Sequence, residues 1–171
     1  MADEKQPTKI AAPKSFNKVI ISGNVEVTLI QSGNERISYA DDNTGNVKVM
    51  QYGSELKISS ADQGPAKIIV YVKDIYRVQA SGDAVVKTEG KLDVKYLQLI
   101  LKDHAVASIN AKTESLYTII EDHADLKLSG STNSHSVVMS NTPKLNLDRF
   151  AALKTEMSNP TVGATQMALS K

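Results

Sequence analysis

Two histidines, each preceded by an aspartate, are the residues of this chain whose type and spacing could most directly support chemistry. Asp103-His104 and Asp122-His123 lie in segments that align without a gap, 19 positions apart. Neutral imidazole nitrogen and carboxylate oxygen are ligands for zinc and other divalent ions. If the two segments are neighbouring strands about 4.8 Å apart, these four residues could bind one such ion. No other cofactor is expected.

The same four residues also have a purely structural interpretation. Polar side chains at a repeated turn bond to the backbone and to one another, and a column of Asp and His offsets charge that would otherwise repel. His135 falls on another part of the repeat, so it offers no third imidazole at the matching place. Because the spacing follows from the repeat itself, the structural interpretation is favoured here.

Paired carboxylates suggest a second chemistry, glycoside hydrolysis. Such enzymes use two carboxyl groups roughly 5 to 9 Å apart, and Asp103, Glu121 and Asp122 could gather on one surface. A cleft is also needed, and a chain of 171 residues without long insertions has little material for its walls. We therefore expect solvated carboxylates and assign no catalytic residue.

Tyrosines are the remaining candidates for a ligand surface. Tyr96 and Tyr117 occupy related positions near the starts of two expected strands, and Tyr71 and Tyr76 flank the strand and turn before them. Rings on one flat face could hold a glycan or a partner protein. The alternative, packing in or at the edge of the core, is the commoner fate of tyrosines.

These candidates all belong to a weak repeat with a period of about 20 residues. Inward columns of small or aliphatic residues can be aligned through four units: Ala84, Val86, Thr88; Ala105, Ala107, Ile109; Ala124, Leu126, Leu128; and Pro143, Leu145, Leu147. The intervening column, Val85, Val106, Asp125 and Lys144, should point outward. The pattern predicts an all-β fold, a single-stranded right-handed parallel β-helix with coils of about 19–21 residues.

One domain is expected over residues 16–171, after a disordered leader or tether over residues 1–15. Residues 16–58 should form the first coils and include a hairpin over 47–58, whereas residues 149–154 could make one helical turn. The stretch 161–169 is nearly uncharged. An unpaired end strand of this kind favours a homo-oligomer formed through strand edges or coil ends.

Composition excludes several functions. The formal net charge is +1, with three arginines and no tryptophan, which is poor material for binding nucleic acid. No segment approaches the roughly 18 apolar residues of a transmembrane helix. The absence of cysteine is compatible with any redox compartment. No phosphate loop, calcium loop, dinucleotide fingerprint or nucleophile elbow occurs in the sequence.

Residues 16–33, FNKVIISGNVEVTLIQSG, resemble the opening of the auto-transporter adhesin head domains, the head GIN family. Residues 78–85 are similar to that family's recurring Ser-Gly corners, whereas residues 102–104 and 121–123 replace Ser-Gly by Lys-Asp-His and Glu-Asp-His. The family is typical of exported Bacteroidetes proteins, often lipoproteins, and has no established catalytic residues.

The resemblance implies a β-helical, non-enzymatic module in the periplasm or at the outer membrane or cell surface, with its signal peptide removed. Its partner would be an unidentified protein or glycan. Two other functions remain open from the residues themselves. One is a small carbohydrate-binding or polysaccharide-active β-helix protein, and the other is a divalent-metal site at the Asp-His positions.

Overall fold

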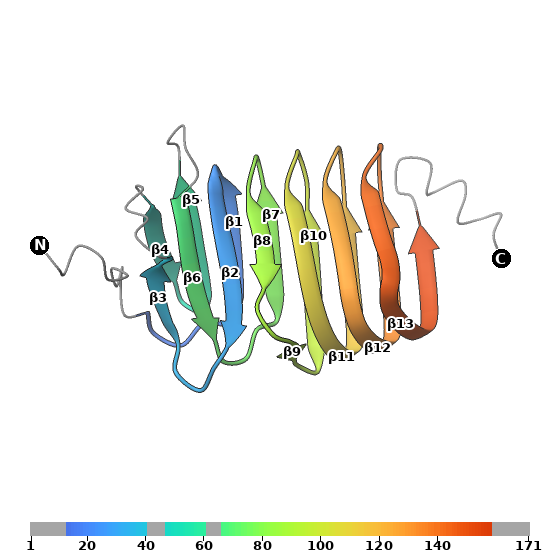
Figure 1. The fold of residues 1–171 in the computed structure, drawn as a ribbon, viewed down its shortest axis with the longest axis horizontal. Coiled ribbons are helices and arrows are strands. Elements are labelled where there is room, and N and C mark those ends of the chain that lie inside the picture. Colours follow the sequence, from blue (N-terminus) through green and yellow to red (C-terminus); the bar gives the residue numbers. More distant parts are fainter. Residues whose placement is uncertain (1–12, 41–46, 61–65, 159–171) are drawn as a thin grey trace, which may run out of the picture.

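The structure, a computed structural model, describes residues 13–40, 47–60 and 66–158, and this part of the chain is built from strands (Figure 1). The strands are β1 (Lys18–Gly23), β2 (Val25–Gln31), β3 (Arg36–Tyr39), β4 (Lys48–Tyr52), β5 (Glu55–Ser60), β6 (Ala66–Val72), β7 (Arg77–Ser81), β8 (Val85–Thr88), β9 (Leu92–Asp93), β10 (Tyr96–Leu101), β11 (Val106–Ile120), β12 (Asp125–Met139) and β13 (Lys144–Ser158). Within these ranges no helix could span a membrane. The expected all-β class is confirmed.

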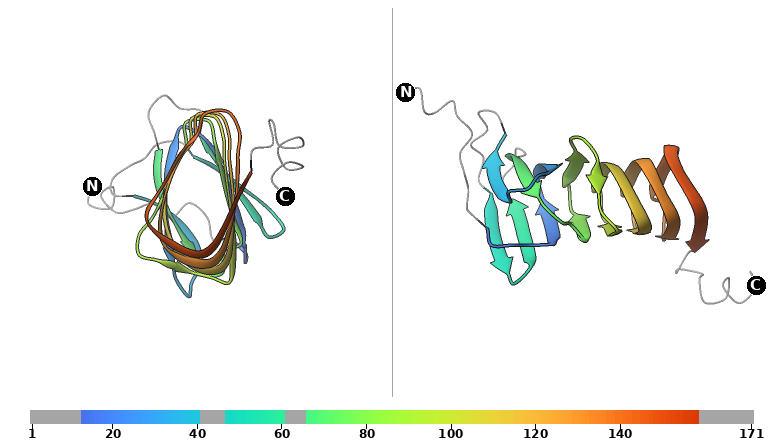
Figure 2. Two further views of the ribbon diagram at one scale, coloured as in Figure 1. Left: turned by 90° about the vertical axis from the view of Figure 1, so that its right-hand side faces the viewer. Right: turned by 90° about the horizontal axis from the view of Figure 1, so that it is seen from below.

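The repeat corresponds to turns of chain that lie side by side. β11 pairs with β12 in parallel, each residue facing the one 19 positions later, from Val106 opposite Asp125 to Ile120 opposite Met139. β12 pairs with β13 in the same direction, with one irregularity between Lys127 and Ser129. Seen end-on, these turns superimpose as a flattened loop (Figure 2). A slip of one residue would exchange the inward and outward sets, so the alternation fixes this register.

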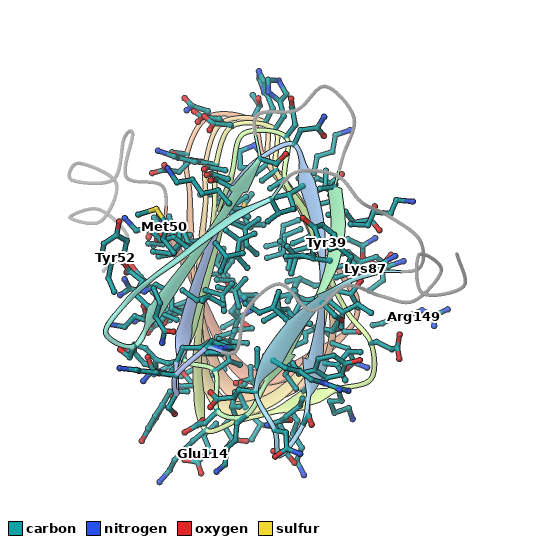
Figure 3. The ribbon with its side chains drawn as sticks, turned by 90° about the vertical axis from the view of Figure 1, so that its left-hand side faces the viewer. Tyr39, Met50, Tyr52, Lys87, Glu114 and Arg149 are labelled. Carbon is teal, nitrogen blue, oxygen red and sulfur yellow. The ribbon has the colours of Figure 1, made fainter. Side chains whose placement is uncertain are left out.

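The interior of the loop is filled by the predicted apolar columns (Figure 3). Those from the regular turns are at most 3% exposed: Ala84, Val86, Ala105, Ala107, Ile109, Ala124, Leu126 and Leu128. Val106, in the predicted outward column, is 42% exposed. Leu145 and Leu147 in β13 are only half-buried, because β13 pairs with β12 alone among the described strands. Residues 149–154, where a helical turn could have formed, are part of β13.

The first strands do not follow chain order. β1 lies between β5 and β7, and β2 lies between β6 and β8. The strands of residues 16–58, which were expected to form the first coils, lie at one end of the molecule, but β6 is inserted between β3 and β2, so they are not stacked in chain order. One edge of β2 pairs with β6, which comes much later in the chain. Local periodicity does not encode this long-range pairing.

Two antiparallel pairs complete this end of the molecule, β3 with β6 and β4 with β5. The second is the hairpin predicted over residues 47–58, and its turn contains Gly53 with φ of +61°. The sheet is consequently mixed and curled, and the uniformly parallel arrangement expected from the sequence is not present here. Residues 1–12 of the predicted leader and the stretch 161–169 lie outside the described residues.

Candidate functional site

Successive turns bend at a common corner where the backbone enters the left-handed region. The corner residues are Gly23, Gly82, Asp103, Asp122 and Asn141, with φ of +81°, +69°, +61°, +60° and +67°. This conformation costs an ordinary L-residue about 1–2 kcal/mol, less where a short polar side chain bonds locally. The aspartates that open the two Asp-His pairs therefore stand where other turns carry glycine.

The side chains of these aspartates fasten one turn to the next. The Gly82 backbone N–H donates to Oδ2 of Asp103 at 2.9 Å, and the Asp103 N–H donates to Oδ2 of Asp122 at 3.2 Å. Nδ2 of Asn141 donates to Oδ1 of Asp122 at 2.9 Å. Each carboxylate thus satisfies the corner of the preceding turn, as the structural interpretation of these residues requires.

The histidines that follow are exposed and adjacent. The ring centroids of His104 and His123 are 5.3 Å apart with planes tilted by 50°. Nδ1 of His123 lies 2.9 Å from the Thr142 hydroxyl, in the corner of the next turn. Within the described residues no group of three or more His, Cys, Asp or Glu side chains is arranged to hold a metal ion. Of the four residues expected to bind an ion, the structure thus places the two imidazoles side by side but adds no larger ligand set.

Three of the four predicted tyrosines, Tyr76, Tyr96 and Tyr117, lie on one long side of the flattened loop, which we call the tyrosine face. It is formed by the outward positions of β10 and of the second halves of β11 and β12: Tyr96, Gln98, Ile100, Ser115, Tyr117, Ile119, Ser134, Ser136 and Val138. None of these nine side chains is charged. Tyr96 is 52% exposed and Tyr117 is 38% exposed, so both rings are available to a ligand.

Pairing register sets these side chains in rows across the strands. Tyr96 lies beside Ser115, which lies beside Ser134, and Gln98 lies beside Tyr117, which lies beside Ser136. A third row is aliphatic, consisting of Ile100, Ile119 and Val138. The face therefore presents alternating aromatic rings and hydroxyl groups along one edge, and apolar side chains along the other.

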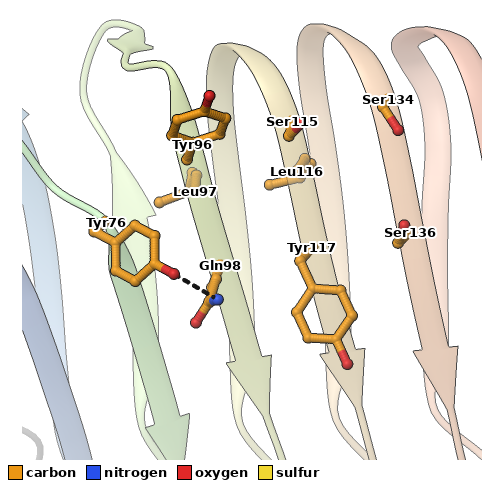
Figure 4. Close-up of a pocket in the computed structure, with 9 residues that line it drawn as sticks. All are labelled: Tyr76, Tyr96, Leu97, Gln98, Ser115, Leu116, Tyr117, Ser134 and Ser136. Atoms are coloured by element: carbon orange, nitrogen blue, oxygen red, sulfur yellow. Dashed lines mark hydrogen bonds between the residues drawn. The ribbon is translucent and has the colours of Figure 1, made fainter.

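A depression of about 260 Å³ is centred on this face and is also lined by Tyr76 (Figure 4). Gln98 is fixed within it, because its Nε2 donates to the Tyr76 hydroxyl at 3.0 Å and its Oε1 accepts from Nε of Arg77 at 2.8 Å. The Tyr76 hydroxyl accepts one bond and keeps its own proton for another. The depression combines aromatic surface with oriented, uncharged hydrogen-bonding groups.

A polar pair is buried directly beneath the tyrosine face. His135 is 1% exposed, its Nε2 lies 3.0 Å from the Thr118 hydroxyl, and its ring packs edge-on against Phe150. Its Nδ1 has no hydrogen-bond partner among the described residues. Burial lowers the pKa of His135 from 6.5 to about 4, so the ring is neutral near pH 7. The register places it beside Leu116 of the adjoining turn.

The opposite long side, which we call the charged face, has different chemistry. Its outward positions lie on β2, β8 and the first halves of β11, β12 and β13, and include Glu26, Thr28, Val85, Lys87, Val106, Ser108, Asp125, Lys127, Lys144 and Asn146. Lys87 and Glu26 form an ion pair of 3.2 Å. Tyr71 points outward from this side beneath the guanidinium of Arg36, 4.1 Å from its ring centroid, and so does not join the tyrosine face.

Sequence reasoning missed Gln98 as the centre of the depression and His135 as a buried group. The signal for Gln98 was present in the alignment of the repeat, since it occupies the row of Tyr117 and Ser136. His135 stands in the inward position that Leu97 and Leu116 fill in the two preceding turns, and composition gives no reason to expect an imidazole there.

Comparison with known proteins places these features in context. The model of the family described as "Putative auto-transporter adhesin, head GIN domain" matches residues 15–170. A "putative adhesin" from Parabacteroides merdae has a similar structure, with TM-score 0.63 and 15% identity, covering 90% of this chain and 77% of that one. No curated protein matches the sequence significantly.

Two structures from Parabacteroides distasonis are similar to the same degree. One is described as a "putative lipid binding protein", with TM-score 0.62 and 12% identity, covering 90% of this chain and 78% of its own. The other is a "putative adhesin", with TM-score 0.61 and 11% identity, covering 90% and 77%. At these identities the likeness shows a shared fold.

Proposed function

The chain belongs to this head GIN adhesin family, and from that premise we propose that it is a non-enzymatic binding module displayed at the cell envelope or surface. Export to the periplasm or outer membrane, with attachment as a lipoprotein, is part of the proposal. The family description and the adhesin-like relatives support a surface location. The observation that carries the binding role is the uncharged tyrosine face with its oriented Gln98.

The ligand we propose for this face is a neutral saccharide. Sugars present apolar C–H surfaces that stack on aromatic rings, and hydroxyl groups that need neutral donors and acceptors. Tyr96 and Tyr117 supply exposed rings, and Gln98 with the neighbouring serines supplies the polar groups. None of the nine outward side chains is charged, and the nearest cation, Arg77, is already bonded to Gln98, which favours a neutral ligand over an acidic one.

A partner protein is the competing ligand, and the aliphatic row of Ile100, Ile119 and Val138 is the feature that would suit it. These three side chains are only partly exposed, whereas the tyrosine rings stand further out. The balance of exposed surface on this face is therefore aromatic and hydroxylic, which favours the saccharide.

A polysaccharide-active enzyme is less well supported. Of its candidate carboxylates, Asp103 accepts a backbone hydrogen bond at the corner, and both carboxylate oxygens of Asp122 are engaged there. These groups have a structural task that explains their position. We therefore propose binding without hydrolysis.

Glycan-array binding by the full chain tests the proposed function. The Y96A/Y117A variant should lose most of the signal from neutral glycans, whereas K87A/K127A on the charged face should keep it. Thermal melts of both variants provide the control for folding. Loss of binding in the lysine variant alone, or equal binding by the chain and Y96A/Y117A, would contradict the proposal.

Self-association through the β13 edge is a further part of the proposal. β13 carries a free edge within the described residues, and its Leu153 and Met157 side chains are 85% and 57% exposed. Such an edge can pair with the same strand of a second copy. Light scattering of the full chain should show a dimer or larger species, and a monodisperse monomer would contradict this part.

We also propose that the parallel turns from β10 to β13 are coils of a right-handed β-helix. The 19-residue register supports coils of constant length, and right-handed crossovers are the rule between parallel strands of one sheet. An experimental structure showing left-handed turns, or turns that do not close around the interior, would contradict this classification.

A further inference from the structure

We propose that His104 and His123 form a two-imidazole site for zinc or another late first-row divalent ion. An ion bound tetrahedrally at about 2.0–2.1 Å to one nitrogen of each ring sets the two ring centroids about 5 Å apart. The observed centroid separation is 5.3 Å, and both rings are exposed to solvent. The observed centroid separation therefore matches that of two imidazoles sharing one ion.

The outer contact of His123 has the arrangement that metal-ligating histidines use. Its Nδ1 is engaged by the Thr142 hydroxyl at 2.9 Å, so Nε2 is the nitrogen left for an ion. In metal sites such a contact to the second ring nitrogen fixes the orientation and tautomer of the ring.

The backbone that carries both rings is held by hydrogen bonds between successive turns. The backbone N–H of His104 donates to Gly82 O at 3.1 Å, and that of His123 donates to Asp103 O at 2.9 Å. The Asp103 and Asp122 carboxylates lock the same corner through the bonds described above. Holding the two histidines in place before an ion arrives reduces the entropic cost of binding.

This site differs from the four-residue set expected from the sequence. Because the two aspartates serve the corner, the ligands reduce to two imidazoles, and no third His, Cys, Asp or Glu completes a group among the described residues. Water would occupy the remaining coordination positions. Imidazole favours late first-row ions and gives little affinity for Mg²⁺ or Ca²⁺, and Cu²⁺ should bind more tightly than Zn²⁺.

The test is titration of the untagged full chain with ZnCl₂, CuCl₂, MgCl₂ and CaCl₂. Calorimetry should show one saturable site for Zn²⁺ and a tighter one for Cu²⁺, with no heat from Mg²⁺ or Ca²⁺. In NMR spectra with Zn²⁺, the ring signals of His104 and His123 should shift together at one equivalent. The signal of buried His135 should stay in place as an internal control.

Variants assign the site. H104Q and H123Q should each lower Zn²⁺ affinity at least tenfold, and T142V should lower it to a smaller degree, while circular dichroism shows all three folded. Absence of saturable Zn²⁺ binding at millimolar concentration would overturn the proposal. So would affinity that is unchanged in either histidine variant, because the ion would then be held elsewhere or by one ring alone.

Discussion

The two long sides of the flattened loop are built from the same turns yet present opposite chemistry. On the charged face, five of the ten outward positions defined above carry a charge, and Lys87 pairs with Glu26. On the tyrosine face, none of the nine outward positions of β10, β11 and β12 is charged, although β13 continues two of their rows with Lys154 and Glu156. Strand pairing and core packing constrain both sides equally, so the outward residues of each side can differ without loss of the fold.

The layers beneath the two sides differ as well. Behind the charged face the inward positions are apolar, such as Ala107 and Leu126, whereas behind the tyrosine face the Thr118–His135 pair is buried. A solvated, charged exterior over an apolar interior is the ordinary arrangement of a soluble sheet. The tyrosine face departs from it on the outside and the inside, which is why we assign the ligand to that side.

A fall in pH should produce the largest difference in local stability between the two sides. His135 has a pKa of about 4 in the folded protein against 6.5 when unfolded, so between these values the unfolded chain binds a proton that the folded chain does not. Its contribution to stability is complete above pH 6.5 and falls as the pH drops toward 4, by up to about 3 kcal/mol. Denaturant unfolding of the chain and of H135L at pH 7 and 4.5 measures this difference.

The H135L variant should lose less stability between those two pH values than the unmodified chain, with H104Q as the exposed control. Hydrogen exchange at pH 4.5 should show amides 134–138 losing protection before amides 125–129. Equal pH dependence in H135L would show that the buried imidazole is not responsible.

Removal of both exposed rings should have the next largest effect. Y96A/Y117A is expected to weaken saccharide binding roughly 10- to 100-fold, since each aromatic contact contributes about 0.5–1.5 kcal/mol. The matched K87A/K127A variant should bind within twofold of the unmodified chain. Isothermal calorimetry with a glycan selected on the array measures both, and a larger loss in the lysine variant would reverse the assignment of the faces.

Replacement of Gln98 should have a smaller effect. Q98L removes the oriented amide that would bond to the saccharide, and one lost neutral hydrogen bond costs about 0.5–1.5 kcal/mol. We expect binding to weaken about 3- to 10-fold by calorimetry, and the melting temperature to fall by a few degrees because the bonds to Tyr76 and Arg77 are lost. Unaltered affinity would show that the depression is not part of the binding site.

The smallest effect is expected on the charged face. E26Q breaks the ion pair with Lys87, whose side chain is half-exposed. Such surface ion pairs contribute about 0–1 kcal/mol to the free energy of unfolding. Denaturant unfolding should therefore change little, and glycan binding should not change. A marked loss of binding would show that the charged face also contacts the ligand.

The regular turns could be predicted from sequence because period-two alternation encodes them locally. The columns through Ala105 and Ala124 are buried as expected, and the aspartate corners take the place of glycine. The insertion of β1 and β2 between later strands could not be predicted, because it depends on pairing between distant segments such as β2 and β6. Periodicity shows that a strand exists but does not identify its neighbour.

The candidate sites were predicted in part for the same reason. Tyr96 and Tyr117 could be found because the repeat aligns them, whereas the fixing of Gln98 by Tyr76 and Arg77 requires side-chain geometry. The aspartates beside the histidines could not be assigned to the backbone rather than to a metal without the corner hydrogen bonds. Residue types indicate the available chemistry, and contacts decide which of it each residue performs.

Chemical-shift mapping of the full chain with a neutral oligosaccharide tests the central claim most directly. We expect saturable shifts confined to the outward residues of β10 and of the second halves of β11 and β12, with the signals of Tyr96, Gln98 and Tyr117 shifting most. Shifts centred on the charged face or at the ends of the sheet would contradict it, as would a tyrosine face that responds only to a protein partner.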